Sequence, residues 1–186
     1  MPAVLIPLAE GCEELEAVTL IDLLRRADFT VVTASLTKQQ QVTASRGVRL
    51  VADVWLEDVM HDDFDMIVLP GGLPGATYLN DDHRIHAILK RLNKSGKAIA
   101  AICAAPLVLA HAGLVNGKTI AHYPEVLHSN EWPNVMLSDD AIVIDGNILT
   151  SRGPGTAMDF ALTIIEYLSN KKTRDGVEAS LARTIF

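Results

Sequence analysis

The chain of 186 residues has few aromatic residues, only two cysteines and no excess of positive charge. Aromatic residues make up 5% of the chain although 49% is hydrophobic, so the core has to be built from alanine, valine, isoleucine and leucine. This composition favours an α/β protein with buried parallel strands, and the length suits a single domain over residues 1–186.

What is missing also limits the classes of function. The two cysteines, Cys12 and Cys103, form neither a disulfide framework nor a metal-ligand spacing, so we expect no metal. The formal charge of −7 without a long basic run gives no evident nucleic-acid patch. No apolar run reaches membrane-span length unbroken, and the amino terminus lacks a basic signal region. We therefore expect a reduced, soluble, cytoplasmic protein.

The hydrophobic pattern predicts a three-layer α/β sandwich, a mostly parallel sheet with helices on both faces. A short strand is expected around KTIAH and another around NVMLSD, and a polar helix at the end. Helix 81–96 is expected to begin at a cap on Asn80 or Asp81, and GGLPGA (71–76) to be a glycine-rich turn. The remaining predicted elements are strands 3–8, 29–35, 65–70 and 97–103, helices 13–27, 104–113 and 154–170, and hairpins 42–53 and 141–151, turning at Arg46-Gly47 and Asp145-Gly146.

Cys103 lies where a strand gives way at once to a helix, in AIAAICAAPLVLA (98–110). Such an elbow lifts a side chain out of the sheet, and the start of a helix favours a thiolate. A free cysteine in an alanine-rich strand end is also a common inert core residue. The residues around Cys103 leave both interpretations open.

An acidic cluster, GCEELEA, follows the first strand. On a helix over 13–27, Glu13 and Glu16 fall on the apolar face, whereas Glu14 lies at its boundary and is expected to be a solvated partner of the helix dipole. A desolvated glutamic acid has a raised pKa and can donate a hydrogen bond to a thiolate, whereas an ionised one raises the pKa of the thiol. The protonation state of Glu16 therefore decides how Cys103 behaves.

Other candidates lie near the same strand ends. His122 is a possible third partner, although a lone histidine there is more often structural. The backbone N–H groups of Gly71, Gly72 and Ala104 are candidate donors to an oxyanion, or simply part of tight turns. Arg46 and Arg152 are candidate anion ligands, or ordinary surface arginines.

Five stretches occur together in the order and spacing of one known family. They are LAEGCEELEAVTLIDLLRRA, TASRGVRLVAD, DMIVLPGGLPGA, AIAAICAAPLVLA and LTSRGPGTAMDFALTIIE. On these motifs the chain resembles the ThiJ/PfpI superfamily, most closely its branch of DJ-one and YajL proteins. The resemblance covers nearly the whole chain, although Ala44 and Val51 replace secondary cysteines of some relatives and Cys12 is an extra thiol.

The resemblance implies a flavodoxin-like sandwich that forms a homodimer and needs no cofactor. It makes Cys103 the nucleophile, Glu16 its protonated acid partner, and His122 a nearby histidine. It places Glu13 near the pocket and makes Gly72 and Ala104 the backbone donors. The arginines that it places around the pocket are Arg46, Arg152 and the partner subunit's Arg26.

Three functions are compatible with these residues. The leading hypothesis is an enzyme of the glyoxalase or deglycase type, acting on a small reactive carbonyl such as methylglyoxal or on glycated protein. The alternative is a redox-sensing stress protein or chaperone in which Cys103 is oxidised to a sulfinate. A less favoured reading is a PfpI-type cysteine hydrolase that uses His122 with Glu125.

Overall fold

Seven strands form the central sheet in the computed structural model of the protein, which describes residues 1–183. In spatial order they are β10 (Ile142–Asp145), β11 (Ile148–Ser151), β7 (Ala98–Ile102), β6 (Met66–Leu69), β1 (Ala3–Leu8), β2 (Thr30–Ser35) and β5 (Val54–Trp55). All neighbouring pairs are parallel except β10 with β11. The carboxyl ends of the parallel strands therefore meet along one edge of the sheet.

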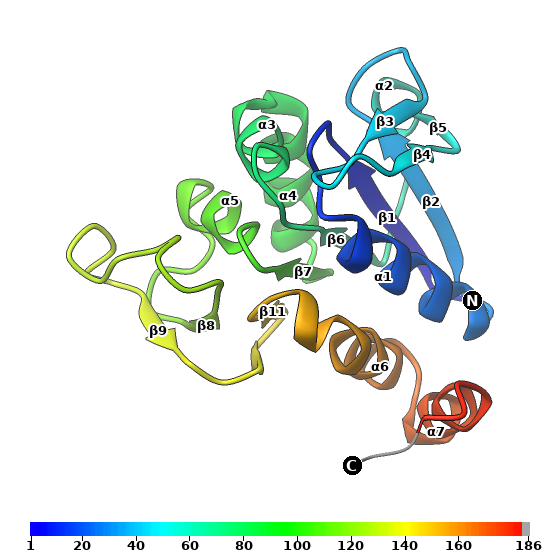
Figure 1. The fold of residues 1–186 in the computed structure, drawn as a ribbon. Coiled ribbons are helices and arrows are strands. Elements are labelled where there is room, and N and C mark those ends of the chain that lie inside the picture. Colours follow the sequence, from blue (N-terminus) through cyan, green and yellow to red (C-terminus); the bar gives the residue numbers. More distant parts are fainter. Residues whose placement is uncertain (184–186) are drawn as a thin grey trace.

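Helices cover both faces of this sheet (Figure 1). α1 (Glu14–Arg26) and α6 (Ala157–Leu168) pack together on one face, and α7 (Lys171–Ser180) lies against α6. The other face carries α3 (Gly75–Asp81), α4 (His83–Lys94) and α5 (Pro106–His111). Among residues 1–183, no helix combines the length and the apolar character needed to cross a bilayer.

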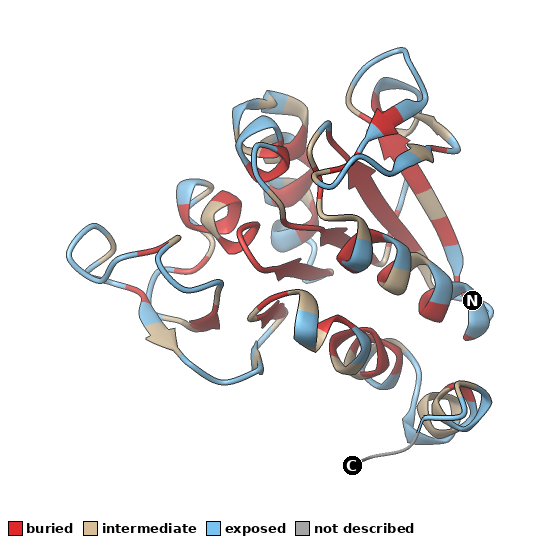
Figure 2. Ribbon diagram, viewed as in Figure 1, coloured by how far each residue is buried: buried red, intermediate tan, exposed pale blue. Residues whose placement is uncertain are grey.

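Alternate residues of the strands pack into two separate hydrophobic cores, one on each face of the sheet. In β1, Val4, Ile6 and Leu8 pack with α1 and α6, whereas Leu5 packs with α4 and α5. The central strands β1, β6, β7 and β11 are consequently buried along most of their length (Figure 2). This arrangement confirms the predicted three-layer, flavodoxin-like sandwich.

Smaller elements correct several sequence expectations. The 42–53 segment forms the expected hairpin, β3 (Gln41–Thr43) with β4 (Arg49–Val51), and β8 (Thr119–Ala121) pairs with β9 (Met136–Ser138). The β10–β11 hairpin turns at Gly146-Asn147, one residue later than predicted, because Asp145 still pairs with Ile148. The sequence reading did not predict β5, α2 (Leu56–Val59) or α3, which begins inside the expected glycine-rich turn.

The cap of α4 is Asp82, and the prediction of Asn80 or Asp81 was wrong because both residues belong to α3. Asp82 Oδ1 accepts a hydrogen bond from the N–H of Arg84 at 2.9 Å, and Asp82 Oδ2 pairs with the Arg84 guanidinium at 2.6 Å. Both side chains are only 12% exposed, so the pair is partly shielded from water. Asp82 thus ends one helix and starts the next.

We expect Asp82→Ala to lower the free energy of unfolding by about 1–2 kcal/mol, because it removes the cap and leaves the partly buried Arg84 cation with Glu57 as its remaining ionic partner. Chemical denaturation measures this change. Asp81→Ala is the matched control, since Asp81 lies one residue earlier and does not cap α4. An equal loss in the two variants would contradict the assignment of the cap.

Candidate functional site

Cys103 follows β7 directly and has a φ angle of 64°, in the left-handed region that residues with a Cβ rarely adopt. Its N–H donates to the carbonyl of Ser151 at 2.9 Å, and its carbonyl accepts from the N–H of Tyr123 at 2.8 Å. Ser151 ends β11, the strand next to β7 in the sheet, and Tyr123 lies just after β8. The two bonds hold the strained backbone in place. The predicted strand-to-helix elbow is therefore present.

The Cys103 thiol lies at a cavity of about 250 Å³ at the carboxyl edge of the sheet. Its side chain is largely covered, with 7% of the residue exposed. The remaining lining residues come from loops that follow different strands, and they are Glu13, Ser45, Arg46, Gly72, Leu73, Ala104, Tyr123, Val126 and Pro154. The cavity is large enough for a small organic molecule to contact the sulfur.

Glu16 lies behind the thiol and is fully buried in the first turn of α1. Its Oε2 accepts a hydrogen bond from the N–H of Gly71 at 2.8 Å. Its Oε1 is buried and makes no standard hydrogen bond with the described residues, which leaves it free to interact with the neighbouring thiol of Cys103. Glu16 and Cys103 both adjoin Gly71, so the carboxyl group lies next to the sulfur without lining the cavity.

The surroundings raise the pKa of both the carboxyl group and the thiol. Burial raises the pKa of Glu16 to about 7, although the N–H of Gly71 and the adjacent Cys103 thiol act in the opposite direction. Burial and the charge of Glu16 raise the pKa of Cys103 to about 12, although the N–H groups of Gly72 and Ala104 act in the opposite direction. Two adjacent anions are unfavourable here, so the pair keeps at least one proton at neutral pH.

This buried acid makes stability depend on pH. The pKa of Glu16 is raised in the folded protein from 4.5 to about 7, so its favourable contribution is complete below pH 4.5 and is lost as the pH rises through 7. We expect Glu16→Gln to be more stable than the parent at pH 8 by up to about 3 kcal/mol, and to match it near pH 4. Denaturant titrations at the two pH values test this; the same difference at both would contradict it.

The glycines beside the thiol are required by close contacts. A Cβ atom at Gly71 would lie 2.7 Å from the Cβ of Cys103, and Gly72 has a φ of 87°. The expectation that the Gly71 N–H serves an oxyanion was wrong, because Glu16 already accepts it. The N–H groups of Gly72 and Ala104 lower the pKa of Cys103, so both donors lie near its sulfur, and their role toward an oxyanion stays a prediction.

The acidic cluster is arranged differently from the helical projection. α1 begins at Glu14, so Glu13 is its half-buried cap and accepts the N–H of Glu16 at 2.7 Å. Glu13 still lines the cavity, as the resemblance implied. Glu14 is not a simple solvated partner of the helix dipole, because it binds the β3–β4 turn.

His122 and two arginines do not line the cavity. His122 Nδ1 lies 2.7 Å from the carbonyl of Tyr123, and the structure describes no hydrogen bond from His122 to Cys103 or Glu16. Arg152 pairs with Asp139 at 2.7 Å and lines an adjoining depression that shares Tyr123 and Pro154 with the cavity. Arg26 pairs with Asp22, and the role predicted for it belongs to a second chain.

Ser45, Leu73, Tyr123, Val126 and Pro154 line the cavity, and the sequence analysis missed all five. None carries a recognisable chemical motif, although Ser45 adjoins Arg46, and Tyr123 adjoins His122. Their adjacency to the selected residues was the available signal. Within residues 1–183, no group of three or more histidine, cysteine or acidic side chains is arranged to hold a metal ion.

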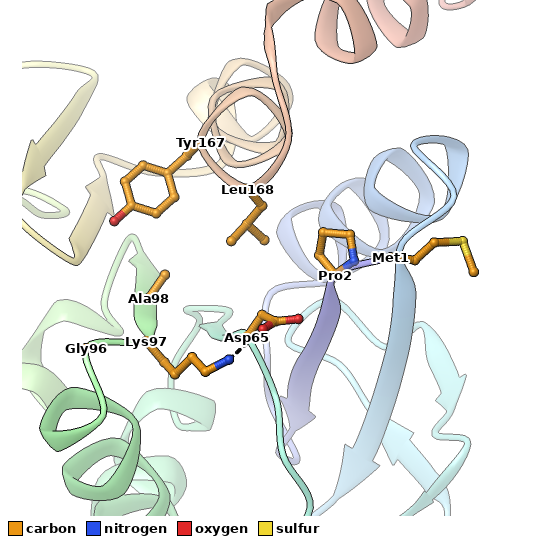
Figure 3. A pocket seen from close by; sticks show the side chains of 8 residues that line it. All are labelled: Met1, Pro2, Asp65, Gly96, Lys97, Ala98, Tyr167 and Leu168. Carbon is orange, nitrogen blue, oxygen red and sulfur yellow. Dashed lines mark hydrogen bonds and ion pairs between the residues drawn. The ribbon is translucent and has the colours of Figure 1, made fainter.

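A larger depression of about 490 Å³ lies at the opposite end of the sheet, near the amino ends of β1, β6 and β7 (Figure 3). Its lining includes Lys97 and Asp65, whose charged groups pair at 2.7 Å. The hydrogen bond and charge of Asp65 raise the pKa of Lys97, which keeps this amine a cation. A paired cation is a weaker chemical candidate than the thiol and carboxyl group at the other end.

The fold and the site define a class of flavodoxin-like α/β proteins with a cysteine at a strained elbow beside a buried carboxyl group. The family model described as "DJ-1/PfpI family" matches residues 2–167 of the chain. The chain belongs to the DJ-1/PfpI family, which confirms the predicted resemblance.

Individual relatives support the same assignment. The chain is 42% identical to the Drosophila melanogaster "Protein dj-1beta" over 168 residues, 90% of each chain. It is 40% identical over 165 residues to a Caenorhabditis elegans protein named "Glutathione-independent glyoxalase DJR-1.2", covering 89% of this chain and 87% of that one. It is 43% identical to the Arabidopsis thaliana "Protein DJ-1 homolog B" over 166 residues, 89% of this chain but only 37% of that protein.

Solved structures agree with the fold. The crystal structure of Drosophila melanogaster DJ-1beta superposes with a TM-score of 0.93 at 40% identity, covering 99% of both chains. The structure titled "Toxoplasma gondii DJ-1, oxidized" gives a TM-score of 0.92 at 38% identity and covers 100% of both.

Proposed function

We propose that the protein is a cofactor-independent enzyme of the glyoxalase or deglycase type that acts in the cytoplasm. Its substrates would be α-oxoaldehydes such as methylglyoxal, free or as early adducts with amines and thiols of proteins. The juxtaposition of the Cys103 thiol, at a small cavity, and the buried Glu16 carboxyl group, both beside Gly71, carries this proposal. The name of the Caenorhabditis elegans relative gives independent support.

The first step uses the proton that the pair shares. Glu16 accepts the thiol proton, and the Cys103 sulfur forms a bond to the aldehyde carbon, whose oxygen becomes the oxyanion of a hemithioacetal. The N–H groups of Gly72 and Ala104 already interact with the sulfur, so an oxygen on the attached carbon lies within their reach. Their hydrogen bonds stabilise the negative charge as it forms.

The second step moves a proton between the two adjacent carbons of the bound substrate. Glu16 first gives the thiol proton to the oxyanion, which leaves a neutral hemithioacetal and a Glu16 carboxylate. The former aldehyde carbon is one bond from the sulfur beside Glu16, so this carboxylate removes its C–H proton and returns it to the neighbouring carbon, while the hydroxyl proton of the hemithioacetal moves to the former ketone oxygen. The product is a thioester of a 2-hydroxy acid on Cys103. Water then cleaves the C–S bond, which releases the acid (lactate from methylglyoxal) and restores the thiol.

Product analysis tests the proposal directly. The parent protein is incubated with methylglyoxal without glutathione, and lactate is quantified against a protein-free control. We expect one lactate for each methylglyoxal consumed. Consumption without lactate would indicate simple thiol scavenging and would contradict the proposed reaction.

Oxidation of Cys103 to a sulfinate is a second candidate function, as part of a redox-sensing protein or chaperone. The N–H groups of Gly72 and Ala104 and the acid Glu16 are donors suited to the sulfinate oxygens. A relative from Toxoplasma gondii has been solved in a form titled "oxidized". Mass spectrometry after mild peroxide treatment tests this candidate, and preferential oxidation of Cys12 or of methionines would contradict it.

A homodimer is proposed as the working form, with the partner subunit's Arg26 near the cavity. Exposed apolar side chains on α1 and on the β3–β4 hairpin support a contact there, and these are Leu15, Val18, Val48 and Val51. Sedimentation analysis tests the dimer.

The cysteine-hydrolase alternative has less support, because the described residues show neither an ion pair between His122 and Glu125 nor a hydrogen bond from His122 to Cys103.

A further inference from the structure

The β3–β4 hairpin is attached to the segment between β1 and α1. The N–H of Gly11 donates to the carbonyl of Thr43, and the N–H of Ser45 donates to the carbonyl of Cys12, both at 2.8 Å. Glu10 adds a side-chain bond, accepting the N–H of Thr43 at 3.1 Å. These bonds hold the base of the hairpin and the backbone of Ser45 in its turn, residues 44–48. Within the turn, the N–H of Ala44 donates to the carbonyl of Val48 and the N–H of Gly47 donates to the carbonyl of Ala44.

Glu14, the first residue of α1, adds side-chain contacts to this turn. Its Oε2 accepts the hydroxyl of Ser45 at 3.0 Å, and both of its oxygens accept the N–H of Arg46, at 2.9 and 3.1 Å. The N–H of Val48 adds a longer bond at 3.5 Å. Burial alone would raise the pKa of Glu14, but these bonds and its own N–H lower it below the ordinary value. One carboxylate thus satisfies several donors of a turn more than thirty residues away.

The turn that Glu14 holds is a wall of the Cys103 cavity. Ser45 and Arg46 both line that cavity, and Arg46 is the basic side chain among its lining residues. The Arg46 side chain is otherwise tethered only weakly, by a 3.4 Å bond to the carbonyl of Ser45. The position of its cation therefore depends on the backbone of the turn.

We propose that Glu14 is a positioning residue, whose carboxylate fixes the Ser45–Arg46 turn and so keeps the Arg46 cation at the mouth of the cavity that holds Cys103. The proposal rests on the proposed function in one respect, that reactants reach Cys103 through this cavity. The site then favours reactants that bring negative charge toward the sulfur. Glu14 acts on the chemistry through Arg46 and does not itself touch the reacting atoms.

Alkylation of Cys103 tests this proposal without requiring turnover. Rate constants are measured for iodoacetate, which is an anion, and iodoacetamide, which is neutral but similar in size, by mass spectrometry of the Cys103 peptide. The iodoacetate-to-iodoacetamide ratio reports the charge near the sulfur and cancels changes in thiol reactivity. The variants are Glu14→Ala and Glu14→Gln, which remove the same charge but differ in hydrogen bonding.

The glutamine amide keeps an acceptor for the N–H of Arg46 and can donate to the Ser45 hydroxyl, so it retains the turn. We expect the ratio in Glu14→Ala to be about threefold lower than in Glu14→Gln, the size of one exposed charge interaction. Equal ratios in these two variants would overturn the proposal. A higher ratio in Glu14→Ala would also overturn it, because the loss of negative charge would then outweigh any positioning.

Arg46→Ala supplies a second route to the same conclusion if Glu14→Ala folds poorly. We expect Arg46→Ala to lower the ratio, and Glu14→Gln combined with Arg46→Ala to lower it no further than Arg46→Ala alone. An unchanged ratio in Arg46→Ala would overturn the proposal. Lactate formation by the parent is scored separately, so failure of the proposed enzyme reaction and failure of the role of Glu14 are distinguishable.

Discussion

Replacing Cys103 by alanine is expected to lower kcat/KM for methylglyoxal at least about 10⁴-fold, because the atom that forms the covalent bond is lost. The variant retains a Cβ at the φ of 64°, so the elbow bears the same backbone strain as in the parent. Removing one buried sulfur from a site with 7% exposure leaves only a small gap. The loss of activity should therefore appear in a protein that is still folded.

Cys12→Ala is the matched control for the second thiol. Cys12 is fully buried in the core and does not line the cavity. Burial raises the pKa of its thiol to about 12, and the charge of Glu14 adds to this rise. We expect Cys12→Ala to keep a rate close to that of the parent. If Cys103→Ala retained a tenth of the parent rate, or if Cys12→Ala lost as much as Cys103→Ala, the assigned nucleophile would be wrong.

The central strands were predictable because they are fully buried on both faces. The sequences of parallel strands in that position are nearly continuous apolar runs, such as AVLIPL in β1 and MIVL in β6. Their order in the sequence placed Glu16, Gly72 and Cys103 at one edge of the sheet. Short elements such as β5 and α3 gave no such pattern, because they are too brief to show a period.

The parts of the site that escaped prediction depend on contacts between distant segments. The bond from Glu14 to the turn at Ser45 joins residues 31 positions apart, and both are polar residues that a sequence pattern reads as surface. Tyr123 lines the cavity, and its N–H donates to the carbonyl of Cys103, twenty positions earlier in the chain. Helical projection failed at Glu13 for a local reason, since the helix begins one residue later and Glu13 becomes its cap.

Replacing Glu16 by glutamine is expected to lower kcat for methylglyoxal about 10³-fold, within the range for loss of a general acid–base group. The amide still accepts the N–H of Gly71, so the local backbone is retained, but it cannot carry a proton between the thiol and the substrate. Glu57→Gln is a suitable control, because it removes an exposed carboxylate on α2 that does not line the cavity. A fall of less than tenfold would contradict the proton-transfer role.

The pH profile separates this role from a structural one. In the parent, the thiol and carboxyl pair loses its first proton as the pH rises through about 7 and its second near 12, so kcat/KM should rise through pH 7 and then stay level. The rise near pH 7 belongs to Glu16, and it should be absent from the residual activity of Glu16→Gln. A variant that was merely misfolded would lower the plateau without moving the midpoint.

Alkylation of the same variant should change in the opposite direction to turnover. In the parent, the charge of Glu16 adds to burial in raising the pKa of Cys103 to about 12. Glu16→Gln removes that charge, so the midpoint for iodoacetamide should fall, and at pH 9 the thiol should react faster than in the parent. A thiol that is easier to alkylate but slower to turn over methylglyoxal is what the loss of a proton carrier produces. A slower alkylation would instead mean that Glu16 stays protonated and stabilises the thiolate, which would reverse the assignment of the shared proton.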